Sequence, residues 1–142
     1  MATLRDMVEA FSELVQSADD GLGIPCRKGF PDFSTLNLRP PLAALFYAGS
    51  REGQAGEVRK RIGASVSAVV VTLGVYASNE VELFELAMML QQIRERKPVL
   101  SAGLDNQKIR VYVGDDERVE PDEDAPKEER HWIRAAVVLA YE

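Results

Sequence analysis

Residues 57–77 read EVRKRIGASVSAVVVTLGVYA, and this stretch decides the fold because it predicts one long β-strand. From Val66 onward the residues are mostly β-branched or aromatic, which is typical of a strand. Side chains of a strand alternate between two faces, so one apolar face carries Val69, Val71, Leu73, Val75 and Ala77. Gly63 permits a bend before this apolar part. We expect the basic part, residues 57–62, to project from the body in a hairpin with residues 42–48.

A first amphipathic helix is predicted over residues 3–17. Thr3 can cap its start, and Asp6, three residues on, forms a variant of the capping box. The apolar residues recur at the spacing of one helix face and are Leu4, Met7, Val8, Phe11, Leu14 and Val15. This face is expected to cover the sheet.

A second helix is predicted over residues 78–96, where Ser78 or Asn79 can act as the cap. Acidic residues lie near its start and basic residues near its end, as the helix dipole favours. Its apolar residues cover more than half of the circumference. We therefore expect burial on two sides, with Met88 and Met89 filling the core.

Three further strands complete the predicted fold. Residues 42–48 are apolar on both faces, and residues 108–113 and 131–141 alternate between apolar and polar positions. The order is then α-β-β-α-β-β. We predict a single α+β domain over residues 1–142, in which a mainly antiparallel four-stranded sheet, with a long bent β-hairpin, packs against two helices.

Two irregular segments interrupt this pattern. Residues 22–41 form an extended arm rich in Gly and Pro that still holds apolar side chains, so it can lie over its own core or on a neighbouring subunit. Residues 115–130 form an acidic loop with nine acids and three bases, whereas the rest of the chain has fourteen of each. A chain without a basic excess is not expected to be a general nucleic-acid binder.

The sequence contains none of the strong catalytic motifs. A phosphate-binding loop, GxGxxG, HExxH and GxSxG are all absent. The chain has one cysteine, Cys26, and one histidine, His131, too few for the usual zinc sites. We therefore expect a non-enzymatic protein with no catalytic residue, no cofactor and no metal. A single cysteine also fits a reducing compartment, and no apolar run is long enough for a membrane helix.

The order and the residue types of several segments resemble those of a known protein family. They are a strand preceded by Pro40-Pro41, the basic stretch 57–62 running into residues 69–71, a helix that begins at Asn79, and a late strand that begins at Trp132. In these features the chain resembles the tail terminator (tail completion) proteins of long-tailed bacteriophages and related contractile particles.

The resemblance implies a structural virion protein, assembled in the host cytoplasm and placed in the tail near the head–tail junction. Such proteins form a homohexameric ring that caps the tail tube, ends tube polymerisation and provides the attachment surface for the head and neck. The implied partners are the chain itself, the tail tube protein, the neck or connector protein and, as a further candidate, the sheath. DNA passes through the lumen without sequence-specific binding, and no membrane is involved.

The resemblance also indicates contact residues. Arg59, Lys60 and Arg61 match the family's long basic β-hairpin, and Arg51 adds to their charge. In a ring, this basic hairpin can meet the acidic loop of the next subunit. Trp132 is either an ordinary anchor of the last strand or an interface residue. We expect these five residues to contact a subunit or the tube.

Two other functions stay open at this point. The first is a neck or head–tail connector subunit, or a tail-tube-like subunit. The second is a small non-enzymatic ligand-binding α+β module. The mass of the native assembly distinguishes a ring from a monomer that binds a metabolite.

Overall fold

The computed structural model describes residues 2–29, 31–33, 38–46, 68–121 and 123–142. These residues contain the helices α1 (Leu4–Gln16) and α3 (Glu80–Arg96) and a short 3-10 helix, η1 (Lys127–Glu129). The strands are β1 (Cys26–Lys28), β2 (Leu42–Phe46), β3 (Ala68–Tyr76), β4 (Val99–Ala102), β5 (Gln107–Val113), β6 (Glu117–Arg118) and β7 (Trp132–Tyr141).

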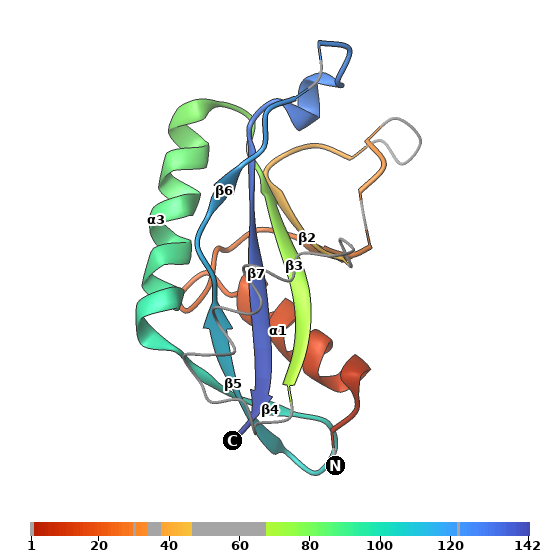
Figure 1. The fold of residues 1–142 in the computed structure, drawn as a ribbon, viewed down its shortest axis with the longest axis vertical. Coiled ribbons are helices and arrows are strands. Elements are labelled where there is room, and N and C mark those ends of the chain that lie inside the picture. The colour runs from red at the N-terminus through yellow and green to blue at the C-terminus, as the bar shows by residue number, and fades with distance from the viewer. Residues whose placement is uncertain (1, 30, 34–37, 47–67, 122) are drawn as a thin grey trace.

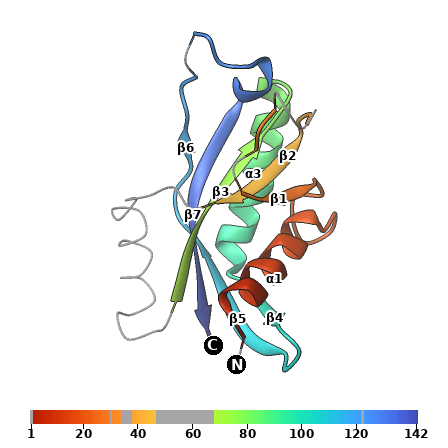
Figure 2. The same cartoon turned by 90° about the vertical axis from the view of Figure 1, so that its right-hand side faces the viewer.

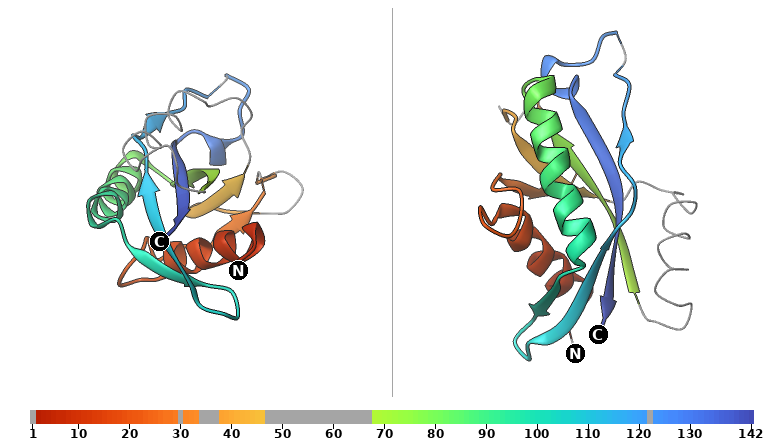
Figure 3. Two further views of the ribbon diagram at one scale, coloured as in Figure 1. Left: turned by 60° about the horizontal axis from the view of Figure 1, so that its bottom comes forward. Right: turned by 90° about the vertical axis from the view of Figure 1, so that its left-hand side faces the viewer.

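All seven strands belong to one mixed sheet. Its order is β1-β2-β3-β7-β5-β4, and β6 also pairs with β7. Among the described strands, only β1 and β2 pair in parallel. β3 and β7 form the centre, with a register that runs from Ala68↔Ala140 to Tyr76↔Trp132. The sheet curls into a half-barrel, as Figures 1 and 3 show.

The predicted order α-β-β-α-β-β and the four-stranded, mainly antiparallel sheet are wrong. Strands β1, β4 and β6, which have three, four and two residues, are absent from the predicted order. Strands this short show no alternation of their own, and they form because a neighbouring strand offers backbone partners. Residues 57–67, which carry the predicted projecting part of the long strand, lie outside the described residues.

The caps of both helices explain where the helices begin. Thr3 Oγ1 accepts a hydrogen bond from the Asp6 backbone N–H at 3.2 Å, and Thr3 N–H donates to Asp6 Oδ2 at 3.0 Å. The predicted capping box is therefore confirmed. At α3, Asn79 rather than Ser78 is the cap, and its Oδ1 accepts from the Glu82 N–H at 2.9 Å.

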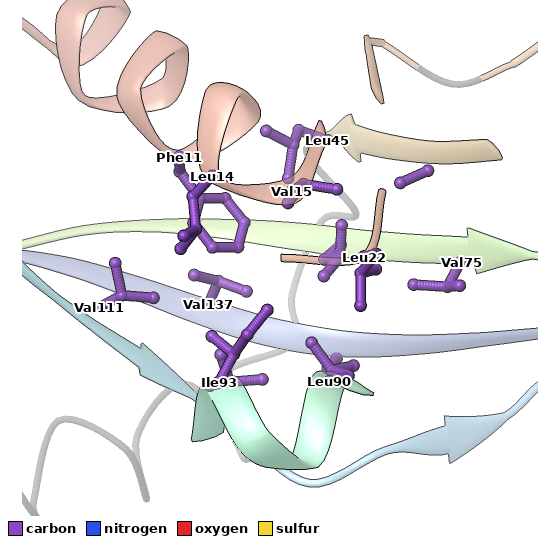
Figure 4. Packing of buried hydrophobic residues seen from close by; sticks show 14 of the residues in the cluster. Phe11, Leu14, Val15, Leu22, Leu45, Val75, Leu90, Ile93, Val111 and Val137 are labelled. Atoms are coloured by element: carbon purple, nitrogen blue, oxygen red, sulfur yellow. The ribbon is translucent and has the colours of Figure 1, made fainter. Parts of the chain in front are cut away.

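Both helices cover the same face of the sheet, which Figure 2 shows from the side. The main core lies between them and the strands, and Figure 4 shows part of it. Its helical members are Met7, Phe11, Leu14, Val15, Leu83, Leu86, Leu90 and Ile93. The strands contribute Ala43, Leu45, Leu73, Val75, Ile109, Val111, Val113, Ile133, Ala135, Val137 and Leu139. These strand residues alternate as the sequence pattern predicts.

The described part of the arm lies on its own domain. Leu22 and Ile24 are buried in the main core, and Phe33 is buried on the opposite face of the sheet. The arm was predicted to lie either over its own core or on a neighbouring subunit. For these three side chains, the structure shows the first arrangement.

Candidate interaction surfaces

The outward face of α3 carries apolar side chains that the domain does not cover. Val81, Phe84 and Met88 are 70%, 67% and 56% exposed, and Met89 beside them is 39% exposed. Positions i, i+3 and i+7 lie on one side of a helix, so the first three form a stripe opposite the buried residues. We call Val81, Phe84, Met88 and Met89 the α3 stripe. Two acids, Glu85 and Glu95, lie on the same side of the helix.

The predicted burial of this helix on two sides is wrong within the protomer. One side packs on the sheet through Leu83, Leu86, Leu90 and Ile93, while Met88 and Met89 lie on the surface and do not fill the core. A second layer of the same domain therefore does not explain why apolar residues cover so much of the circumference of α3. A partner that covers the stripe would account for it.

A second exposed apolar group lies where the β4–β5 hairpin meets α1. Leu104, at the tip of the hairpin, is fully exposed, and Leu4 in the first turn of α1 is 57% exposed. Gly103 holds a φ of +76° and lies so close to α1 that a Cβ atom there would be 3.1 Å from Asp6 Oδ2. This contact brings the two leucines to the same end of the molecule, and we call Leu4 and Leu104 the hairpin corner.

The surroundings of the hairpin corner carry both signs of charge, since the carboxylates of Asp6 and Asp105 lie beside Gly103. Arg5 follows Leu4 and is exposed, and Lys108 lies on the strand that leaves the hairpin. The hairpin's own acid, Asp105, accepts a hydrogen bond from the backbone of Gln107. Both ends of the described chain also meet here, since Tyr141 Oη donates to the Ala2 carbonyl oxygen at 2.6 Å.

An aromatic cluster lies on the sheet face opposite the two helices, where β3 ends and β7 begins. Trp132 stacks on Tyr76 with 4.7 Å between ring centroids and 8° between ring planes, and Phe33 meets Tyr76 edge-on at 5.2 Å. Gly74 allows this packing, because a Cβ atom there would be 3.1 Å from Phe46 and from the Tyr76 ring. Trp132 is only 8% exposed, so its placement favours the strand anchor over the interface residue.

The edge of this cluster contains buried polar groups. The Tyr76 hydroxyl is buried and has no hydrogen-bond partner among the described residues. Its burial, together with the nearby Glu129 carboxylate, raises the pKa of Tyr76. The pKa of Glu129 is also raised, first by burial and then by the charges of Asp32 and Glu128. The surroundings of Tyr76 and Glu129 therefore disfavour further negative charge.

The acidic loop is tied to the body by ion pairs. Asp116 pairs with Arg94 at 2.5 Å, and Glu117 pairs with Arg134 at 2.8 Å. Glu128 lies 3.7 Å from Arg39. These acids are therefore engaged within the protomer, which leaves fewer of them to meet the basic side chains of a neighbour.

Glu80 joins the start of α3 to the end of the acidic loop. Its carboxylate accepts hydrogen bonds from Arg118 and, at 2.9 Å, from His131 Nδ1. These two partners, Arg118 first, lower the pKa of Glu80 to about 2. The three side chains thus connect α3, β6 and the residue that precedes β7.

We expect the Glu80→Gln variant to be less stable than the wild type at neutral pH. The difference should shrink as the pH falls from about 4.5, the ordinary pKa of the carboxyl group, to about 2, because protonation removes the same charge from the wild type. Urea unfolding at several pH values measures this difference. The matched control is Glu85→Gln, because Glu85 on the same helix has no ion pair among the described residues. A difference for Glu80→Gln that persists at pH 2 would contradict the expectation.

No family model, curated protein or solved structure matches this chain. Within the described residues, no group of three His, Cys, Asp or Glu side chains is placed to hold a metal ion. Neither described helix has the length and apolar character needed to cross a bilayer.

The five contact residues expected from the sequence are not brought together. Arg51, Arg59, Lys60 and Arg61 lie outside the described residues, and Trp132 is buried in the aromatic cluster. The α3 stripe and the hairpin corner are surfaces that the sequence reasoning missed. The breadth of the apolar pattern on α3 was a sign of the first, whereas Leu4 and Leu104 come to the same end of the molecule only through the fold.

Proposed function

We propose that this chain is a structural subunit of a viral tail. In this proposal, copies of it assemble into a ring that caps the tail tube, ends tube polymerisation and offers the attachment surface for the neck of the head. Its partners are other copies of the chain, the tail tube protein, the neck or connector protein and the sheath where one is present. It works in the virion, near the head–tail junction, and DNA passes through the ring without sequence-specific binding.

The α3 stripe is the observation that carries the self-assembly part of this proposal. Contiguous exposed apolar side chains on a helix are characteristic of surfaces that another protein covers. Phe84 and Met88 are residue types enriched at such interfaces, and the two glutamates beside them keep the free subunit hydrated.

The sheet edges favour association through the helix rather than through strand addition. The two edge strands, β1 and β4, have three and four residues. β1 also carries the exposed side chains of Arg27 and Lys28. Short edges with charged side chains discourage pairing between sheets of different molecules.

The proposal is tested with the purified chain and the tail tube protein encoded in the same genome. Native mass spectrometry should give a ring, with a hexamer expected, either alone or after the tube protein is added. Electron microscopy should show that tubes assembled with the chain end in a cap and stop growing. A chain that stays monomeric with tubes present, and tubes that grow unchanged, would overturn the proposal.

A further inference from the structure

We propose that Glu129 and Tyr76 form an acid-operated latch at the base of the acidic loop. When Glu129 takes up a proton, its neutral carboxyl group turns inward and donates a hydrogen bond to the Tyr76 hydroxyl oxygen. When Glu129 is charged, the carboxylate stays outside, and η1 is held less firmly on the sheet. The latch belongs to a single protomer, so the inference goes beyond the proposed function and does not depend on it.

The inner half of the latch is the Tyr76 hydroxyl. The Tyr76 side chain is fully buried, and its hydroxyl has no hydrogen-bond partner among the described residues. A buried polar group without a partner destabilises the folded chain, so a donor that reaches it stabilises the fold. The rings of Phe33 and Trp132 hold the Tyr76 ring in place, so the donor has to move to the hydroxyl.

The outer half of the latch is Glu129, the last residue of η1. The Ala77 N–H donates to the His131 carbonyl oxygen at 2.8 Å, which holds the end of the loop beside the residue that follows Tyr76. Glu129 lies two residues before His131 and is partly buried. Burial and then the nearby charge of Glu129 raise the pKa of Tyr76. A rotation of the Glu129 side chain can therefore bring a donor to the buried hydroxyl.

Charged groups of both signs lie on the elements around Glu129. Burial raises the pKa of Glu129 first, and the charges of Asp32 and Glu128 raise it further. A charged carboxylate that turned further inward would lose more of its hydration, whereas the protonated group avoids most of this cost. The charged groups on these elements are Asp32 and Arg39 of the arm, Glu128, His131 and the exposed Lys127 and Arg130 of the loop, Glu117 of β6, Arg134 of β7 and Glu80 of α3.

The two arginines on the neighbouring arm and strand are engaged with other acids. Arg39 lies 3.7 Å from Glu128, and Arg134 forms an ion pair with Glu117 at 2.8 Å. The part of the chain that the structure describes contains no ion pair of Glu129. The charged form of Glu129 therefore gains no direct partner that would oppose its protonation.

The Glu129→Gln variant tests the latch at neutral pH, because the glutamine amide is uncharged and can donate to the same oxygen. This variant should unfold at a higher urea concentration than the wild type. In the wild type, the proton stabilises the fold fully below about 4.5, the ordinary pKa of the carboxyl group, and this contribution is lost as the pH rises through the raised pKa of folded Glu129. The advantage of the variant should therefore vanish in acid. Both proteins keep Glu80, so its titration cancels in the comparison.

The matched control is Glu123→Gln. Glu123 is an exposed acid of the same loop, so its replacement removes the same charge from the surface and none from the surroundings of Tyr76. Its urea midpoint should equal that of the wild type at neutral pH and in acid.

The Tyr76→Phe variant separates the latch from a simple release of charge, because it lacks the acceptor. In this background, Glu129→Gln should raise the urea midpoint by about half as much as in the wild-type background, or less. Carbon-13 NMR titration of the Glu129 carboxyl group gives a second measurement. Its pKa should be lower in Tyr76→Phe than in the wild type, since a hydrogen bond made by the neutral form raises a carboxyl pKa.

Three results would each overturn the inference. The first is a Glu129→Gln variant that unfolds at the wild-type urea concentration at neutral pH. The second is an equal effect of Glu129→Gln with and without the Tyr76 hydroxyl, and the third is a Glu129 pKa that Tyr76→Phe leaves unchanged. The last two would mean that Glu129 responds to burial and neighbouring charge alone. None of these measurements depends on ring formation, so the proposed function stands or fails separately.

Discussion

Replacing Phe11 by alanine is expected to lower the free energy of unfolding by about 3–5 kcal/mol. The Phe11 side chain is fully buried in the main core, between α1 and the strands. Its removal takes away the transfer free energy of a large aromatic group and leaves a cavity that the neighbouring side chains fill only in part. Urea denaturation followed by circular dichroism measures the loss.

The matched control is Phe84→Ala, the same chemical change on the exposed side of α3. Phe84 is 67% exposed, so the change should alter the unfolding free energy of the dilute protein by less than about 0.5 kcal/mol. It should instead weaken self-association at higher concentration. A large loss of stability in the dilute Phe84→Ala variant would mean that the domain itself covers this side chain.

A second large effect is expected at Tyr76. Tyr76→Ala removes the ring between Trp132 and Phe33, and the unfolding free energy should fall by about 3–5 kcal/mol. The start of β7 should loosen as well, since Trp132 loses its stacking partner. Hydrogen exchange at the backbone amides of β7 would show this as faster exchange near Trp132 than near Tyr141.

The matched variant Tyr76→Phe separates the ring from its hydroxyl. The hydroxyl is buried and has no partner among the described residues, so its removal should leave the stability unchanged or raise it by about 1 kcal/mol. A clear loss of stability would show that the hydroxyl does make a hydrogen bond, to a group outside the described residues.

The parts of the fold that could be predicted from the sequence depend on local signals. Thr3 and Asp6 define the start of α1 through a hydrogen-bonded pair three residues apart, and the alternation of β5 and β7 indicates which side chains enter the core. The missed strands β1 and β6 carry mainly charged side chains and are held by pairing with β2 and β7. Such pairing depends on residues distant in the sequence, so no local pattern records it.

The two candidate surfaces also differ in how far local sequence signals could predict them. The apolar residues of α3 are visible in the sequence. The same pattern is expected for a helix buried on both sides by its own domain and for a helix with one exposed apolar side. Only the placement of the sheet shows that Phe84 and Met88 face outward. The hairpin corner depends on the approach of Gly103 to Asp6, which are far apart in the chain.

The hydrogen bond from Tyr141 to Ala2 has a practical consequence for experiments on this chain. Because Ala2 and Tyr141 are held together, a tag or a fluorescent protein fused after residue 142 would lie close to the start of α1. Such a tag would be a neighbour of both the first helix and the last strand, so it should be cleaved before self-association is measured.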